Sequence, residues 1–450
     1  MYESLDAIQV FFYICSSVCM AYQVQSSMAP TMFAAVVLTL LVIFGAAVYF
    51  VFETHEPRAE TRGLYSPASA PTSPVLCCYY DPAWSDETRR GAWAYDLQRH
   101  FPHGHCSHAV FLGARYRNRT VELPDQASAP LVSFLSLRRR GLSVLASVLV
   151  VDIAEAVLDA GDFAATMGTW LRQQGFQGLE LDVGHKMPLV GYDALVKALS
   201  SELRAPAQRL IFSVNIYPTR SFMNHVNLKQ LHDDADILVL NTQDLVNDDQ
   251  FTAAHSALYG KDSWNSSLAA VYAHTGSLSR LVPVVPFTSR EFQLQEPLDG
   301  PNSVSAGLGC RGLAESSQYH STAGTRAFFE VCKIVDDPSW SKVWQDNDYC
   351  YMEAKDMRFI VLEDRESVIC KVKFAEAHRL LGVALKQLDA DAFRASPECG
   401  PANPLLDAVL VEAQRLQPRF NGDPHLWTHA QRRLTVVRAN GKTACLSHVH

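Results

Sequence analysis

The sequence has little charge, and it has none between Ala7 and Phe52. Charged residues make up 19% of the 450 residues, and the formal net charge is −8 at pH 7. Apart from the run Arg138-Arg139-Arg140, no basic stripe is present. Because nucleic-acid binding depends on clustered cationic side chains that meet phosphates, this deficit argues against a nucleic-acid partner.

The sequence also lacks a C-x-x-C pair and any tight cluster of His and Cys. Zinc sites need ligands at such spacings, so we expect no metal site and no cofactor. His100, His103, His105 and His108 lie close together in the chain, but we interpret them as surface and loop residues. We find no internal repeat that would indicate a solenoid or a propeller.

Residues 1–31 contain no Lys or Arg, whereas a secretory signal peptide normally starts with a positive region. Residues 32–52 are dominated by Ala, Val, Leu and Phe and are long enough to cross a bilayer. We therefore expect a short cytoplasmic tail over 1–31 and a transmembrane signal anchor over 32–52, with a signal peptide as the competing interpretation. The Pro-, Ala-, Ser- and Thr-rich residues 53–74 would form a flexible stalk. This arrangement is a single-pass type II membrane protein with a lumenal or extracellular ectodomain.

The most informative segment runs from Gly175 to Gly184. Leu179, Leu181 and Val183 alternate with Glu180, Asp182 and Gly184, which is the period of a β-strand. One face of this strand is aliphatic, and the other carries two carboxylates followed by a residue with no side chain.

This segment resembles the signature strand of family 18 glycoside hydrolases, the chitinases and chitinase-like lectins. The signature is D-x-x-D-x-D-x-E, and in this chain its four positions fall on Gln177, Glu180, Asp182 and Gly184. In the family the last Glu protonates the glycosidic oxygen, while the last Asp steadies the N-acetyl group that attacks the anomeric carbon. The resemblance therefore implies a degenerate site with no catalytic residue, because glycine has no proton to donate. Glu180 and Asp182 should lie too deep in the barrel to replace the missing acid.

The resemblance extends over residues 75–416. Its other segments are matched in the family's order, namely Val75–Tyr80, Cys106–Phe111, Ser147–Val150, Asp236–Asp244, Leu281–Phe292, Arg326–Cys332 and Leu381–Phe393. It implies an α/β fold, a (β/α)8 TIM barrel with a small α+β insertion after strand 7, at about 291–368. The alternation of aliphatic runs with amphipathic stretches independently favours a parallel sheet covered by helices. Residues 417–450 form a C-terminal tail without a counterpart.

The family's sugar cleft is also altered at other positions. Lys386 stands where the family has a stacking Trp, and Gln243 stands where it has a Tyr that binds the N-acetyl group. Leu149 and Val150 replace paired glycines, whereas Asp244 and Arg290 are retained. We expect the ligand cleft to contain Asp182, Gln243, Asp244, Lys386 and Arg290. Lys386 would either form an ion pair with Asp182, and also with Glu180, or extend to the solvated barrel mouth.

The chain has 11 cysteines. The resemblance implies the disulfides Cys78–Cys106 and Cys332–Cys399, while Cys350–Cys370 is a weaker expectation from their places beside a hairpin. Two N-x-S/T sequons, at Asn118 and Asn265, mark candidate glycosylation sites.

Three functions remain open at this stage. The leading one is a membrane-anchored, catalytically inactive chitinase-like protein, a pseudoenzyme whose ectodomain binds chitin or another N-acetylglucosamine-containing glycan. The alternatives are a protein-interaction scaffold without glycan affinity and a residual glycoside hydrolase of carbohydrate metabolism.

Overall fold

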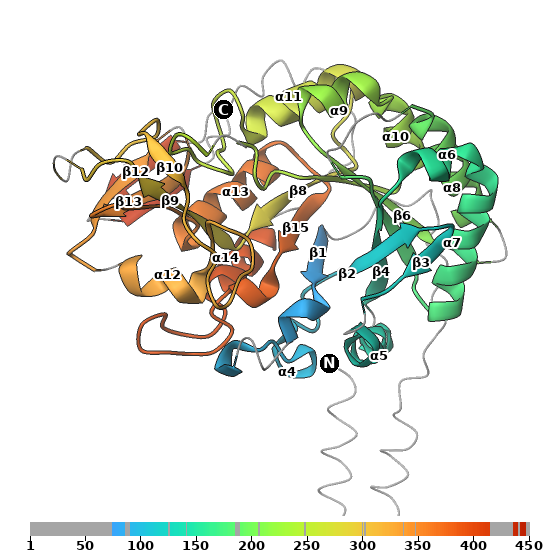
Figure 1. Ribbon diagram of the computed structural model, residues 1–450, viewed down its shortest axis with the longest axis horizontal. Helices are drawn as coiled ribbons and strands as arrows, with labels where there is room; N and C mark the ends of the chain where they lie inside the picture. The colour runs from blue at the N-terminus through green and yellow to red at the C-terminus, as the bar shows by residue number, and fades with distance from the viewer. Residues whose placement is uncertain are drawn as a thin grey trace, which may run out of the picture. The chain divides into compact units, whose positions relative to one another are not determined.

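The computed structural model describes residues 74–414, with gaps at 86–90, 125–126, 141, 185–189, 206–207, 247–248, 299, 301–302, 336 and 347, and the strands at 435–439 and 442–446. Eight parallel strands form a closed barrel, in the order β1-β15-β8-β7-β6-β5-β4-β2, which the pairing of β1 with β2 completes (Figure 1). The barrel strands are β1 (Val75–Tyr80), β2 (His108–Arg117), β4 (Ser143–Val150), β5 (Gly178–Asp182), β6 (Ile211–Ile216), β7 (Ile237–Leu240), β8 (Leu281–Pro286) and β15 (Gly382–Lys386). A short strand, β3 (Thr120–Glu122), pairs antiparallel with β2.

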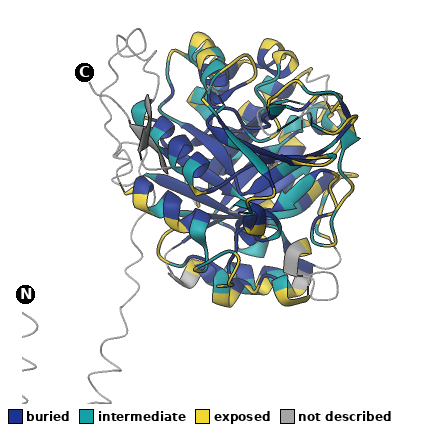
Figure 2. Cartoon of the chain, turned by 90° about the vertical axis from the view of Figure 1, so that its left-hand side faces the viewer, coloured by how far each residue is buried: buried dark blue, intermediate teal, exposed yellow. Residues whose placement is uncertain are grey.

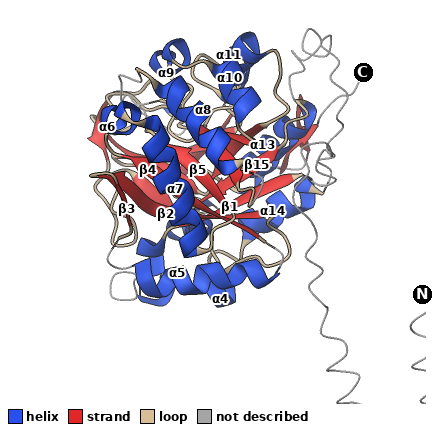
Figure 3. Cartoon of the chain, turned by 90° about the vertical axis from the view of Figure 1, so that its right-hand side faces the viewer, coloured by secondary structure: helices blue, strands red, loops and turns tan. Residues whose placement is uncertain are grey.

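Helices lie around the strands, as Figure 3 shows. The α-helices are α4 (Leu97–His100), α5 (Ser128–Leu135), α6 (Ile153–Leu158), α7 (Ala160–Gln174), α8 (Tyr192–Leu203), α9 (Arg220–His225), α10 (Leu228–Asp234), α11 (Trp264–Thr275), α12 (Phe328–Val335), α13 (Arg365–Ala377) and α14 (Pro404–Ala413). Short 3-10 turns are η2 (Pro82–Ser85), η3 (Gly91–Trp93), η5 (Ser136–Arg140) and η7 (Leu388–Ala390). The expected (β/α)8 barrel is therefore confirmed.

Most residues of the barrel strands are buried, as the dark blue strands in Figure 2 show, and β7 and β8 are continuous apolar runs because both of their faces are buried. On β8, for example, all six residues are buried. Helix α7 precedes the motif strand and has clear ends: the Asp159 side chain accepts a hydrogen bond from the N–H of Asp162, and Gly175 ends the helix at φ 88°. These signals place the turn to β5 directly before Gly178.

The second sheet has the strand order β10-β9-β14-β13-β12, with β11 paired to β9. Its strands are β9 (Thr288–Leu294), β10 (Cys310–Leu313), β11 (Thr325–Ala327), β12 (Ser341–Gln345), β13 (Cys350–Lys355) and β14 (Arg358–Leu362). The sheet starts directly after β8 and ends before α13, so it is inserted between the last two barrel strands. Buried Glu291 holds three of its strands together, because its carboxylate binds Arg326 at 2.5 Å and Arg358 at 2.6 Å.

A buried ion pair joins this sheet to the barrel. Glu363 follows β14, and Lys371 lies on α13; their charged atoms are 2.7 Å apart and both side chains are fully buried or nearly so. Ser367 also donates a hydrogen bond to Glu363 at 2.8 Å. Burial raises the pKa of Glu363, and the nearby Lys371 ammonium opposes that rise.

Two disulfides are present as expected, Cys78–Cys106 and Cys332–Cys399. The expectation of a Cys350–Cys370 bond is wrong, because Cys350 is a free buried thiol. Cys370 is disulfide-bonded, and its partner is not among the cysteines whose side chains are described. The two cysteines lie on different sides of β14, so their places in the sequence gave no sound basis for pairing them.

No helix within the described residues is long and apolar enough to span a bilayer. The expected anchor at 32–52, the tail at 1–31, the stalk at 53–73 and most of 417–450 lie outside the described residues. In the C-terminal region, β16 (Thr435–Ala439) and β17 (Lys442–Leu446) pair antiparallel.

Candidate functional site

Two polar residues of the motif, Glu180 and Asp182, lie on the inner face of β5. The strand register places Ser147 of β4 beside Glu180, and Leu149 beside Asp182. Ser213 of β6 lies beside Glu180 on the other side. Because side chains alternate along a strand, these residues share the barrel interior, and Asp182 stands at the carboxyl end where barrel enzymes carry their sites.

Glu180 is buried within the barrel, with 1% of its surface exposed. The hydroxyl of Tyr79 donates a hydrogen bond to one of its oxygens, and Ser147 donates to the other at 2.9 Å. Burial raises the pKa of Glu180, while the Lys386 charge and the Tyr79 hydrogen bond act in the opposite direction. Glu180 is thus an internal anchor of the barrel wall, with both oxygens already engaged.

Asp182 is partly exposed at the mouth and is held by donors on three sides. Its carboxylate accepts hydrogen bonds from the Gly184 backbone N–H at 2.7 Å, from the Tyr217 hydroxyl at 3.0 Å and from Asn215 Nδ2 at 3.2 Å. Burial, followed by the charge of Asp182, raises the pKa of Tyr217. Tyr217 therefore keeps its proton at neutral pH and remains a donor.

Gly184 occupies the position where the motif places its acid. Its φ is 64°, in the left-handed region that L side chains rarely adopt. A Cβ added there would meet nothing within 4 Å. The space for an acidic side chain exists, but the backbone conformation at this position disfavours one.

Lys386 does not form the expected ion pair. Among the described residues, no ion pair joins its amine to Asp182 or Glu180; instead, Lys386 Nζ lies over the Tyr79 ring, 5.5 Å from the centroid. Its charge still acts on Glu180 through space. The Glu180 oxygens instead accept hydrogen bonds from Tyr79 and Ser147, and Asp182 accepts its hydrogen bonds from Tyr217, Asn215 and Gly184.

The remaining cleft residues lie on neighbouring strand ends. Arg290 binds Asp244 at 3.0 Å, and Gln243 Nε2 donates to Thr288 Oγ1 at 3.4 Å. Two of the expected cleft residues, Asp244 and Arg290, therefore form an ion pair with each other. Gln177 lies elsewhere: its side chain accepts from the Val144 N–H at 3.1 Å, at the start of β5, where it ties β4 to β5.

The sequence patterns did not predict that five other polar residues lie near Glu180 and Asp182, namely Ser147, Tyr79, Asn215, Tyr217 and Asn241. The signal for Ser147 and Tyr79 was the two-residue alternation within their strands, which places them on the same face as the buried carboxylate. Tyr217 follows the end of β6, and its approach to Asp182 depends on the path of the chain after the strand. Local patterns do not encode that path.

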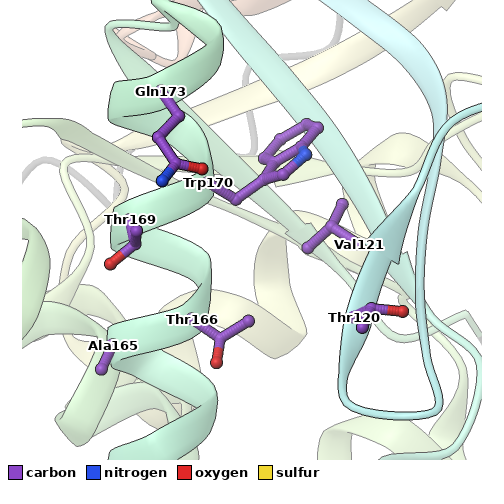
Figure 4. A pocket seen from close by; sticks show the side chains of 7 residues that line it. All are labelled: Thr120, Val121, Ala165, Thr166, Thr169, Trp170 and Gln173. Carbon is purple, nitrogen blue, oxygen red and sulfur yellow. The ribbon is translucent and has the colours of Figure 1, made fainter.

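A separate groove lies outside the barrel, between β3 and α7 (Figure 4). It has a volume of about 450 Å³ and is lined by Thr120, Val121, Ala165, Thr166, Thr169, Trp170 and Gln173. None of these side chains titrates, so the groove has no acid–base chemistry. Within the described part of the chain, no group of three or more His, Cys, Asp or Glu residues is placed to hold a metal ion.

Known proteins share this architecture. The chain is 28% identical to an endochitinase of Manduca sexta over 170 residues, which cover 35% of this chain and 30% of that protein. It is 22% identical to an endochitinase of Brugia malayi over 376 residues, or 76% of this chain and 73% of the other. Human YKL-39, described as a pseudo-chitinase with retained chitooligosaccharide binding, superposes with a TM-score of 0.67 at 17% identity, over 76% of this chain and 99% of YKL-39.

The family model for glycosyl hydrolases family 18 matches residues 75–391. That span contains every barrel strand and the polar residues around Glu180 and Asp182. The chain therefore belongs to glycosyl hydrolases family 18.

Proposed function

We propose that this protein is a catalytically inactive family 18 member that binds chitin-type oligosaccharides at the barrel mouth. Gly184 carries the proposal, because it stands at the proton-donor position with a left-handed backbone and no side chain. A general acid typically contributes a rate factor of about 10²–10⁴. Neither nearby carboxylate replaces it, because Glu180 is buried with both oxygens engaged and Asp182 is held by neighbouring donors.

Retained glycan binding is supported by two observations. Asp182 keeps its place at the mouth, fixed by Tyr217 and Asn215. The structural relative YKL-39 is described as a pseudo-chitinase that still binds chitooligosaccharides. Such a site would recognise sugar without cleaving it.

Two assays test this proposal on the full chain. We expect retention on chitin beads or binding to chito-oligosaccharides, and no release of fluorophore from a fluorogenic chitobioside. Asp182→Ala should weaken binding. Turnover by the wild-type chain that Asp182→Ala abolishes would show a residual hydrolase, whereas a folded chain that binds no oligosaccharide would favour the protein-interaction scaffold.

We further propose that residues 32–52 anchor the protein as a single-pass type II membrane protein. The uncharged segment supports an anchor, and the disulfides Cys78–Cys106 and Cys332–Cys399 fit an oxidising lumenal or extracellular compartment. The protein should remain in membranes after alkaline extraction, and its barrel should resist protease added to sealed microsomes. Release by alkali or digestion of the barrel would contradict the anchor or its orientation.

A further inference from the structure

The polar cluster around Asp182 contains buried acceptor atoms that no described residue satisfies. Asn215 is 0% exposed. Its Nδ2 group donates to Asp182 at 3.2 Å and contacts the Tyr217 hydroxyl at 3.3 Å. Its Oδ1 atom has no donor among the described residues. A buried acceptor left unpaired is destabilising, because it has lost its hydrogen bonds with water and gained none in the protein.

Asn241 repeats this pattern on the next strand end. Burial and the charge of Asp182 raise the pKa of Tyr217, and a hydrogen bond with the Asn241 side chain opposes that rise. The Oδ1 atom of Asn241 is also buried and has no donor within the described residues. The Asn215 amide directs its N–H group to the Tyr217–Asp182 pair. Rotating this amide by 180° would break those bonds, so its unpaired oxygen follows from the arrangement itself.

The carboxylate of Asp182 has no cationic side chain in contact with it among the described residues. Asp182 forms its hydrogen bonds with Gly184, Asn215 and Tyr217, and no described Lys, Arg or His forms an ion pair with it. Lys386 compensates a different carboxylate, since its amine lies over Tyr79 and its charge acts on Glu180. Arg290 is paired with Asp244.

The ligand that completes this cluster should bring hydrogen-bond donors and a positive charge. An N-acetyl group brings one N–H but also a carbonyl oxygen that needs a donor, and the donors here are engaged: Tyr217 donates to Asp182, and Gln243 donates to Thr288. A primary ammonium group brings three donors and no acceptor.

We propose that the barrel mouth selects deacetylated amino sugars, the glucosamine units of chitosan-type oligosaccharides, over N-acetylglucosamine, with Asn215 and Asn241 as the selecting residues. This inference rests on the proposed glycan-binding function and names its ligand class. The ammonium group binds Asp182 and supplies the donors that the two amide oxygens lack. Hydrogen bonds to a charged group are stronger than those between neutral groups, so the preference should appear as a difference of at least about tenfold in Kd.

Isothermal titration of the full chain with two tetrasaccharides tests the inference, one fully deacetylated and one fully N-acetylated. We expect the deacetylated tetramer to bind at least about tenfold more tightly. Asn215→Leu, which keeps the size of the side chain, should remove this preference, and Asn241→Leu should reduce it. Asn224→Ala, on the exposed side of α9, is the control and should change neither affinity.

Each outcome is informative. Equal binding, or tighter binding of the acetylated tetramer, overturns the preference while the proposed glycan binding stands. Binding of neither tetramer by the folded chain removes both proposals. If Asn215→Leu fails to fold, as its melting curve would show, the wild-type comparison and Asn241→Leu decide. Unchanged selectivity in Asn241→Leu would contradict its role.

Discussion

The amine of Lys386 lies over the ring of Tyr79, and the hydroxyl of the same ring hydrogen-bonds Glu180. Tyr79 therefore stands between a cation and a buried carboxylate that do not touch. The interaction over an aromatic face contributes about 0.5–2 kcal/mol. In this way the barrel accommodates Lys386 at its mouth, and the charge of this lysine acts on the buried Glu180.

Restoring the acid alone should not restore hydrolysis. In Gly184→Glu the new side chain must adopt a φ near the 64° of the glycine, which costs about 1–2 kcal/mol. We expect no fluorophore release from a fluorogenic chitobioside and a matching loss in the free energy of unfolding. Gly184→Ala is the control, with the same backbone strain and no carboxyl group. Cleavage by Gly184→Glu that Asp182→Ala abolishes would refute this account.

The buried pair Glu363–Lys371 should be sensitive to the loss of either partner. Lys371→Met leaves a buried carboxylate without its cation, and we expect a destabilisation of about 3–5 kcal/mol in urea unfolding. The matched control is Lys229→Met, which breaks the exposed pair with Asp233 and should change stability by no more than about 1 kcal/mol. Adding Glu363→Gln to Lys371→Met should recover part of the loss. A small loss of unfolding free energy in Lys371→Met alone would show that Glu363 is already protonated in the folded protein.

Stability should fall with rising pH through the titration of Asp391. Its side chain is buried at the start of α14 and accepts hydrogen bonds from the N–H groups of Leu406 at 2.9 Å and Leu405 at 3.3 Å. Burial raises its pKa from 3.8 to about 7. Because the folded-state pKa exceeds the unfolded one, this stabilising contribution is complete below about pH 4 and is lost as the pH rises towards 7.

Urea unfolding at several pH values between 4 and 7.5 checks this prediction. Asp391→Asn should make the decline in unfolding free energy shallower, because the amide does not titrate. Asp262→Asn, at an exposed position before α11, should leave the decline as it is in the wild type. An identical pH dependence in Asp391→Asn and the wild type would assign the effect to other buried acids.

The two sequons should differ in occupancy. Asn118 is exposed at the tip of the β2–β3 hairpin, where Asn118 and Arg119 both have positive φ, as a two-residue hairpin turn requires. Asn265 is half-buried in the first turn of α11, and its sequon serine, Ser267, is 5% exposed. In secretory expression, Asn118→Gln should remove the glycosidase-sensitive mass shift, whereas Asn265→Gln should leave it. The reverse result would mean that modification precedes the folding of α11.

The sequence predicted the barrel because burial on both faces leaves a strong mark on each strand, as in the uninterrupted apolar run of β8. The ion pair between Asp244 and Arg290 was not predicted, because it joins segments that lie 46 residues apart in the chain. The sequence left two arrangements open for Lys386, an ion pair with the carboxylates or an extension to the barrel mouth, because the position of a long side chain depends on neighbours from other strands. The expectation for Cys350 was wrong, since cysteine pairing depends on the distance between the two residues in space.

The hydrogen bonds on Asp182 have one more consequence. Because Gly184, Tyr217 and Asn215 fix the carboxylate in advance, an incoming sugar freezes no rotamer at this residue. The association rate of the sugar should then be governed by its diffusion into the barrel mouth. Differences in affinity between sugars should appear mainly in their dissociation rates.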